Sequence, residues 1–227
     1  MKRYCLYLFI LIGISCSAEL KAQKNGTVYK GNDPAVRYTG RTLVSPDGSV
    51  AFDWVGTYLE TRFTGGKLSV KVSETGTSYY NVFVDGKLHK VVKVCGTDTL
   101  IHLVSGIDKR IHSLKIQKRS EGEFGKTTVH QFVLSGSGRL AEEPAVRTRH
   151  IEFIGNSLTC GYGTDGKHRD EPFLVETENC NLTFASMLAR YYDADYTLIA
   201  HSGRGAARNY GDSVRVSKVT ICLLYTS

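Results

Sequence analysis

The sequence predicts two domains: an all-β sandwich, followed by the first part of a three-layer α/β domain. About eight short runs of alternating or β-branched residues, separated by turn signals, fill residues 26–140. After residue 149, two apolar strands each end in a glycine-rich loop, with a helical pattern between them. The charged run 142–149, which contains Pro144, separates the two halves. We therefore expect a sandwich at 23–143 and an α/β domain at 150–227.

The first half has the spacing of a two-sheet sandwich such as a jelly roll. Asp85-Gly86, between two valine-rich runs, is the clearest hairpin signal. Pro46-Asp47-Gly48, Gly65-Gly66 and residues 105–108 also predict turns. The predicted strands are Val50–Trp54, Tyr58–Phe63, Lys67–Ser73, Tyr80–Asp85, Leu88–Val94, Thr99–Val104, Ile111–Lys118 and Val129–Leu134.

The second half predicts two buried strands and one helix. The strands are Ile151–Ile154 and Tyr196–Ala200. The helix is expected over Leu182–Tyr192, with Asn181 or Thr183 as its cap. Its core face should comprise the apolar residues at helical spacing, Phe184, Met187, Leu188 and Tyr191.

Ser157 is the strongest candidate catalytic residue, because it lies in a glycine-bounded turn directly after a strand. The sheet would fix its hydroxyl and leave open space above it, as a nucleophile requires. Gly161 and Gly163 lack a Cβ, so backbone N–H groups can approach a developing oxyanion. A strand followed by an ordinary polar turn would give the same short pattern.

The longer stretch Gly-Asn-Ser-Leu-Thr-Cys-Gly-Tyr-Gly resembles the first block of SGNH (GDSL-type) hydrolases. Its form is most similar to carbohydrate esterase family 2, two-domain acetyl esterases with a jelly roll ahead of the hydrolase domain. The resemblance implies that Ser157 is the nucleophile and that its N–H is one oxyanion donor. Asn156 stands where the wider pattern has aspartate, which should alter local turn bonding without removing the nucleophile.

The loop after the second strand would carry another oxyanion donor by the same resemblance. Gly203 is the best match and Gly205 is its competitor, although a plain turn also needs glycine. The family's downstream histidine, aspartate and oxyanion asparagine are not recognisable, so we expect a C-terminally truncated domain. If the chain is complete, His201 and His168 are the nearby candidates for the base.

The first 22 residues have the pattern of a secretory signal: Met1-Lys2-Arg3, a short apolar run and a small-residue exit. We expect cleavage after Ala22 and an exported, periplasmic or extracellular protein. A lipid anchor at Cys16 is the alternative. No segment is long enough to span a membrane. The formal net charge of +7 without a long basic run does not indicate a nucleic-acid partner.

No metal or organic cofactor is predicted. The cysteines outside the leader, Cys95, Cys160, Cys180 and Cys222, have no Cys-x-x-Cys spacing. Export would allow a disulfide between Cys160 and Cys180, and we interpret Cys160 as packing or half of that bond. The aromatic residues Trp54, Tyr79 and Tyr80 are expected in the core rather than on a sugar-binding surface. His89 and His112 are expected to face solvent, with no cluster of metal ligands around them.

Two functions of different classes fit these patterns. The first is an exported serine esterase that removes acetyl or other small acyl groups from an acylated polysaccharide or oligosaccharide such as xylan. A lipase or thioesterase of the same superfamily is its variant. The second is a non-catalytic carbohydrate-binding or interaction module, since β-sandwiches host both roles.

Overall fold

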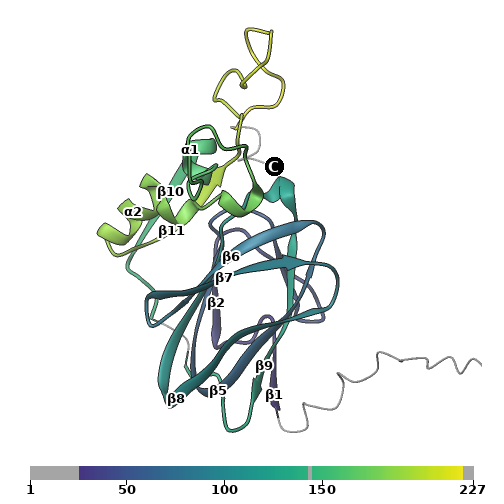
Figure 1. The fold of residues 1–227 in the computed structure, drawn as a ribbon, viewed down its shortest axis with the longest axis vertical. Helices are drawn as coiled ribbons and strands as arrows, with labels where there is room; N and C mark the ends of the chain where they lie inside the picture. Colours follow the sequence, from purple (N-terminus) through teal and green to yellow (C-terminus); the bar gives the residue numbers. More distant parts are fainter. Residues whose placement is uncertain (1–25, 143–144, 222–227) are drawn as a thin grey trace, which may run out of the picture.

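The computed structural model describes residues 26–142 and 145–221 (Figure 1). The expected leader with Cys16, and Cys222 near the other end, lie outside these residues. Within the described ranges, no helix is both long enough and apolar enough to cross a membrane. We call residues 26–142 the β region and residues 145–221 the α/β region.

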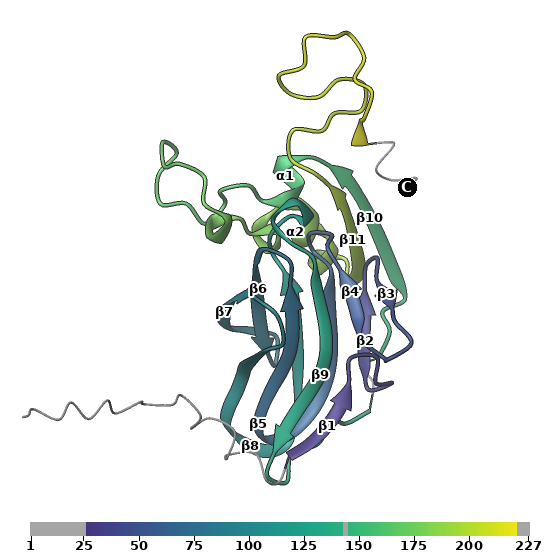
Figure 2. The ribbon, with the colours of Figure 1, turned by 90° about the vertical axis from the view of Figure 1, so that its right-hand side faces the viewer.

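The β region is one curved, antiparallel sheet of nine strands. Its main path runs β3-β4-β9-β5-β8-β6-β7, while β1 pairs with β9 and β2 pairs with β5. Figure 2 shows β6 and β7 on one side of the molecule and β1, β3 and β4 on the other. The strands are β1 (Gly26–Lys30), β2 (Val36–Thr39), β3 (Leu43–Val44), β4 (Val50–Phe52), β5 (Tyr58–Glu74), β6 (Thr77–Val84), β7 (Lys87–Cys95), β8 (Thr99–Lys118) and β9 (Thr127–Ser135).

Two of the predicted turns are wrong, because β5 and β8 are long strands that continue through them. Gly65-Gly66 lies inside β5, where the pairing with β8 shifts register between Thr64 and Ser69. Gly66 has φ +93° and pairs with Ile107, in the segment where the second turn was expected. The glycines therefore form a bulge that bends the two-stranded ribbon instead of reversing it. Asp85-Gly86 does form the predicted hairpin, with φ of 50° and 74°.

The main hydrophobic core fills the inside of the curved sheet. Phe63, Phe132, Leu68 and Leu134 have no exposed surface. Phe132 and Leu134 lie two residues apart in β9 and so on the same face of the strand, as its two-residue repeat requires.

The α/β region contains a strand–helix–strand unit with parallel strands. β10 (Arg149–Gly155) pairs with β11 (Ala194–Ala200), and Ile154 lies opposite Ile199. The helices are α1 (Ser157–Cys160) and α2 (Phe184–Tyr191), and short 3₁₀ turns lie at η2 (Val175–Thr177) and η3 (Cys180–Leu182), with η1 (Gly122–Phe124) in the β region. Figure 1 shows this unit above one end of the curved sheet.

Two burial predictions for the α/β region differ from the structure. β11 is buried as expected, but Ile154 of β10 is 55% exposed, because β10 pairs with β11 alone among the described strands. The helix turns a different face inward than expected: Ala185, Ser186 and Ala189 are buried. Small side chains let α2 lie close to β11, and this leaves the larger predicted face outside. Phe184, Met187, Leu188 and Tyr191 are all exposed.

A second hydrophobic core joins the two regions. Val55 and Tyr58 of the β region pack with Cys160, Tyr196 and Leu198 of the α/β region. The rings of Tyr58 and Tyr196 lie 5.2 Å apart between centroids. Because one core spans both regions, the curved sheet forms the platform on which the strand–helix–strand unit rests.

Candidate active site

Ser157 is the first residue of α1 and follows the end of β10 by two residues. Asn156 caps this helical turn, and its side-chain oxygen accepts a hydrogen bond from the Leu158 N–H at 3.2 Å. Asn156 therefore caps the turn that Ser157 begins. Gly155 is required beneath the turn, since a Cβ there would lie 2.0 Å from Thr159 Oγ1.

Gly203 lies in the loop that follows β11 and has φ +75°, a conformation that favours glycine. Among the described residues, none accepts a hydrogen bond from its N–H group. The N–H of the competitor, Gly205, donates to Asn209 Oδ1 at 3.2 Å. Gly203 is therefore the better placed of the two to offer a free donor.

Ser157 and Gly203 line one cavity of about 600 Å³. It lies beyond the carboxyl ends of β10 and β11, where open α/β sheets bind their ligands. Gly205 also lines it, so both glycines proposed from the sequence face this space. The remaining lining residues are Glu123, Asn156, Tyr162, Ser202, Arg204, Arg208 and Tyr210.

An aromatic stack borders this cavity. The ring of Tyr162 stacks on Phe173 with 3.7 Å between centroids and an 11° interplanar angle. Phe173 in turn contacts Phe124 of η1 at 5.6 Å. Residues from both regions therefore form this wall, and Tyr162 keeps 48% of its surface exposed.

No imidazole among the described residues contacts Ser157. His201 Nδ1 lies 2.9 Å from the carbonyl of Ser202 and 3.7 Å from Glu121, while its Nε2 lies 3.6 Å from Glu123. His168 is exposed on the loop before η2. Neither alternative base from the sequence is therefore engaged with the serine in this structure.

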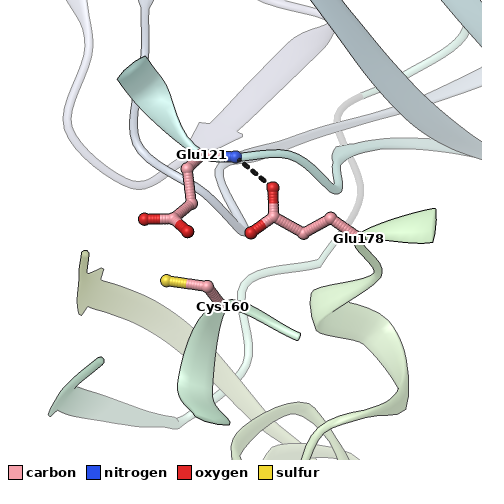
Figure 3. A group of neighbouring side chains, drawn as sticks. All are labelled: Glu121, Cys160 and Glu178. Atoms are coloured by element: carbon pink, nitrogen blue, oxygen red, sulfur yellow. Dashed lines mark hydrogen bonds between the residues drawn. The ribbon is translucent and has the colours of Figure 1, made fainter. Parts of the chain in front are cut away.

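Three buried side chains, Glu121, Cys160 and Glu178, lie close together (Figure 3). Glu121, Cys160 and Glu178 are each at most 1% exposed, and their carboxylate and thiol atoms lie within 4.8 Å of one another. Burial, together with the charge of Glu121, raises the pKa of Glu178 to about 9, and burial also raises that of the Cys160 thiol. This spacing suits either a cation or a proton held between the two carboxyl groups.

The three cysteines in the described part of the chain, Cys95, Cys160 and Cys180, form no disulfide. Cys160 and Cys180 are both free and buried, so the disulfide allowed by the sequence is absent. Cys180 Sγ instead lies 3.4 Å from the carbonyl of Lys118, and Cys160 packs in the second core. The interpretation of Cys160 as a packing residue is confirmed.

The other aromatic and histidine candidates lie away from this cavity. Tyr80 is buried as expected, whereas Trp54 is only half-buried, with the Arg41 guanidinium 5.5 Å from its ring. Tyr79 is half-buried and donates to Glu176. His89 is exposed, as predicted. The solvent-facing prediction for His112 is wrong.

His112 is 2% exposed because it lies between two carboxylates. Its Nδ1 is 2.7 Å from Asp85 and its Nε2 is 2.9 Å from Asp108. Asp85 follows β6 and Asp108 lies in the bend of β8, so the residues meet only through the pairing of those strands.

Sequence reasoning did not find Glu121, Glu178, Tyr162 or the two cavity arginines as site residues. Glu121 follows a β-strand in the other region, and no local motif marks it. Arg204 and Arg208 carry a weak signal, since Arg204 lies in the second glycine loop and Arg208 follows it within a few residues.

Comparison with known proteins places the first region in a recognised domain family. Residues 38–144 match the family model described as carbohydrate esterase 2 N-terminal. This range agrees closely with the β region seen in the structure.

Similarity to curated proteins extends beyond that domain. The chain is 34% identical over 180 residues to the cellulase/esterase CelE of Acetivibrio thermocellus, covering 79% of this chain and 22% of that protein. It is 27% identical to an acetylxylan esterase / glucomannan deacetylase of Cellvibrio japonicus, covering 79% of this chain and 50% of that protein. The chain thus spans half or less of the length of these relatives.

Two solved structures that resemble this chain are also carbohydrate esterases. A family two carbohydrate esterase from Clostridium thermocellum in complex with cellohexaose superposes with a TM-score of 0.77 at 32% identity, over 85% of this chain and 60% of that chain. A family two esterase from Cellvibrio japonicus has a TM-score of 0.78 at 24% identity, over 88% and 59% of the two chains, and supports the fold alone. This protein is therefore a relative of the family 2 carbohydrate esterases, whose N-terminal domain it carries at residues 38–144.

Proposed function

We propose that this chain carries the nucleophile of an exported serine esterase that removes acetyl or other small acyl groups from a polysaccharide. The observation that carries the proposal is the shared cavity of Ser157 and Gly203 at the ends of two parallel strands. The names of the relatives, which include acetylxylan esterase and glucomannan deacetylase, support this substrate class.

In finer detail, we assign the β region to a jelly-roll domain and the α/β region to an SGNH-type hydrolase domain. The curved antiparallel sheet supports the first assignment. The parallel strand–helix–strand unit, with a serine after its first strand and a glycine loop after its second, supports the other. The boundaries are those expected from the sequence, near residues 143 and 150.

In the proposed reaction, Ser157 Oγ attacks the carbonyl carbon of the ester and forms a C–O bond. The carbonyl π electrons move to oxygen, and the N–H groups of Ser157 and Gly203 hold the resulting oxyanion. Collapse of this intermediate breaks the bond to the sugar oxygen, which leaves as a hydroxyl after taking a proton. Water then releases the carboxylic acid from Ser157 in the same two steps.

This mechanism needs a base that accepts the serine proton. His201 contacts Glu121, Glu123 and the carbonyl of Ser202 rather than Ser157. We therefore leave the base unassigned, and we expect slow turnover from the 227-residue chain alone.

The cavity offers two kinds of contact to a sugar. The exposed side of Tyr162, stiffened by its stack on Phe173, presents an aromatic ring beside Ser157. Arg204 and Arg208 add donors for hydroxyl or carbonyl oxygens. A cavity of about 600 Å³ is large enough for an acylated sugar unit.

The test compares the chain with its Ser157→Ala variant, using an aryl acetate and a serine-reactive fluorophosphonate. We expect slow hydrolysis and covalent labelling at Ser157, both lost in the variant. Circular dichroism would verify that both proteins are folded. Equal hydrolysis by the two proteins, with no label on Ser157, would contradict the proposed role of the serine.

A further inference from the structure

The loop that carries Gly203 is held from below by a side chain of the β region. The N–H of Ser202 donates to Glu121 Oε2 at 2.6 Å, and the Ser202 hydroxyl donates to Glu121 Oε1. Glu121 is 1% exposed and lies between β8 and η1, 81 residues before Ser202. Both oxygens of one buried carboxylate therefore fix the residue directly before Gly203.

Glu121 is itself fixed by its neighbours. Its backbone N–H donates to Glu178 Oε2 at 2.9 Å, the contact drawn in Figure 3. Cys160, the third member of the buried group, is the last residue of the helical turn that Ser157 begins. Through this group, Glu121 of the β region is joined to the loop of Gly203 and to the turn of Ser157, which both belong to the α/β region.

The charges of the group make Glu121 the better acceptor. Two carboxylates this close and this buried cannot both remain ionised at low cost. Glu178 Oε1 is buried and has no hydrogen-bond partner among the described residues. A proton on Glu178 removes one of the two charges. The remaining charge then resides on Glu121, which faces the two Ser202 donors.

We propose that Glu121 is a positioning residue for the oxyanion loop: it holds Ser202 so that the Gly203 N–H points into the cavity beside Ser157. This inference rests on the proposed esterase function. It gives the β region a direct part in the active site, beyond supporting the α/β region or binding substrate.

The test uses two isosteric variants, Glu121→Gln and Glu178→Gln. A carboxamide at 121 is uncharged, so it weakens both bonds to Ser202. If its oxygen accepts the Ser202 N–H, its N–H₂ faces the Ser202 hydroxyl, which must then reverse from donor to acceptor. A carboxamide at 178 resembles the protonated acid, because both are uncharged, carry a donor and keep an oxygen that can accept from the Glu121 N–H. The geometry therefore predicts that Glu121→Gln loosens the loop of Gly203 and that Glu178→Gln leaves it in place.

Hydrogen exchange measured by mass spectrometry reports how well the backbone amides of the loop are protected, and it does not require enzymatic activity. We expect faster exchange in the peptide that contains residues 201–205 for Glu121→Gln, with wild-type exchange for Glu178→Gln. In the Ser157-dependent assay, Glu121→Gln should lower kcat about ten-fold or more, because a displaced donor weakens transition-state binding. KM should change little.

Glu121→Asp retains the charge. Compared with Glu121→Gln, it should regain part of the exchange protection and part of kcat. A merely structural role of the Glu121 side chain would not predict this recovery. Unchanged exchange at 201–205 in a folded Glu121→Gln protein would overturn the proposal. An equal rise in exchange at 201–205 and an equal fall in kcat in both isosteric variants would also overturn it. In that case, a melting temperature that falls on addition of EDTA would identify a cation bound between Glu121, Cys160 and Glu178. If the esterase proposal fails because Ser157→Ala has no effect, the exchange result still decides the role of Glu121.

Discussion

Arg37 and Asp195 form an ion pair between the two regions, with Nη1 of the arginine 2.7 Å from Oδ2 of the aspartate. Arg37 lies in β2 and Asp195 lies in β11. Tyr58 donates its hydroxyl to Asp195 at 2.7 Å, and Arg147 donates at 2.8 Å. This carboxylate, 5% exposed, gathers three donors from separate elements and joins the curved sheet to the strand that leads into the glycine loop.

Replacing Asp195 with asparagine should destabilise the protein near neutral pH and much less in acid. Burial opposes ionisation, but hydrogen bonds from Arg37, Tyr58 and Arg147 outweigh it and lower the pKa of Asp195 to about 2. Ionised Asp195 therefore contributes to the free energy of unfolding at pH values above its unfolded-state pKa. This contribution, about 2 kcal/mol, is lost as the pH falls through the folded-state pKa.

Urea unfolding of Asp195→Asn at about pH 7 and about pH 2, near the folded-state pKa, measures this dependence. Asp193→Asn is the matched control, since Asp193 is 89% exposed and has only the Arg147 side chain as a charged partner. A loss of stability that is the same at both pH values would show that the charge of Asp195 is not the cause.

His112 should make the β region less stable as pH rises above the ordinary range of a histidine. Burial lowers its pKa, but the hydrogen bonds to Asp85 and Asp108 outweigh this effect and raise it. Since both ring nitrogens face carboxylates, only the imidazolium can donate to both. The stabilisation is complete below the unfolded pKa and is lost as pH rises through the raised folded value.

The measurement is the urea midpoint of wild type and His112→Gln at several pH values from about 6 to about 9. The variant should lose the alkaline decline that wild type shows. His89→Gln, at an exposed position of β7, should keep it. An identical pH profile for wild type and His112→Gln would exclude the imidazolium as its source.

Gly161 should tolerate alanine far less well than Gly163, although both have positive φ. Their φ values are 83° and 68°. The left-handed conformation costs alanine about 1–2 kcal/mol at either position. At Gly161, the added Cβ would also lie 2.5 Å from backbone atoms of Asn179, whereas nothing lies within 4 Å at Gly163.

The clash should add about 1–3 kcal/mol to the cost of Gly161→Ala. Chemical denaturation of the two variants side by side isolates this difference, because the conformational cost is shared. Equal destabilisation would mean that the segment of Asn179 moves away at little cost.

Local sequence signals predicted the parts of the fold that depend on neighbouring residues. Asp85-Gly86 forms its hairpin because both residues adopt positive φ within a two-residue turn. Ser157 and Gly203 lie on one cavity because parallel strands end at the same edge, so the order strand, loop, helix, strand, loop was sufficient. Their chemical roles remain predictions.

Features that depend on distant pairing could not be predicted from one sequence. Gly65-Gly66 has the composition of a turn, and only its pairing with the bend in β8 makes it a bulge. His112 alternates like a surface residue, but Asp85 and Asp108 bury it. Glu121 reaches the glycine loop from 81 residues away, so its role appears only in three dimensions.

The same reasoning explains the misassigned face of α2. The periodicity of Phe184, Met187 and Leu188 is helical, and the helix does form. Periodicity alone does not say which of two faces packs inward, and the small face of Ala185 and Ala189 allows closer approach to β11. Size complementarity between neighbouring elements, rather than hydrophobicity, determined the orientation.

Arg119 should be essential for attaching the loop before α2 to the β region. Its Nε donates to the carbonyl of Glu178 at 2.7 Å and its Nη2 donates to the carbonyl of Glu176 at 3.0 Å, with a further ion pair to Asp165. The residue is 2% exposed. Arg119→Met would leave these acceptors without donors, and we expect a loss of about 3–5 kcal/mol in the free energy of unfolding.

Chemical denaturation checks this value, with Arg169→Met as the control. The Arg169 side chain is 92% exposed and pairs only with the adjacent Asp170, so its replacement should cost less than about 0.5 kcal/mol. Because Glu178 belongs to the segment that Arg119 holds, Arg119→Met should also speed hydrogen exchange in residues 175–182. A loss of stability without faster exchange there would place the energetic role of Arg119 in the β region alone.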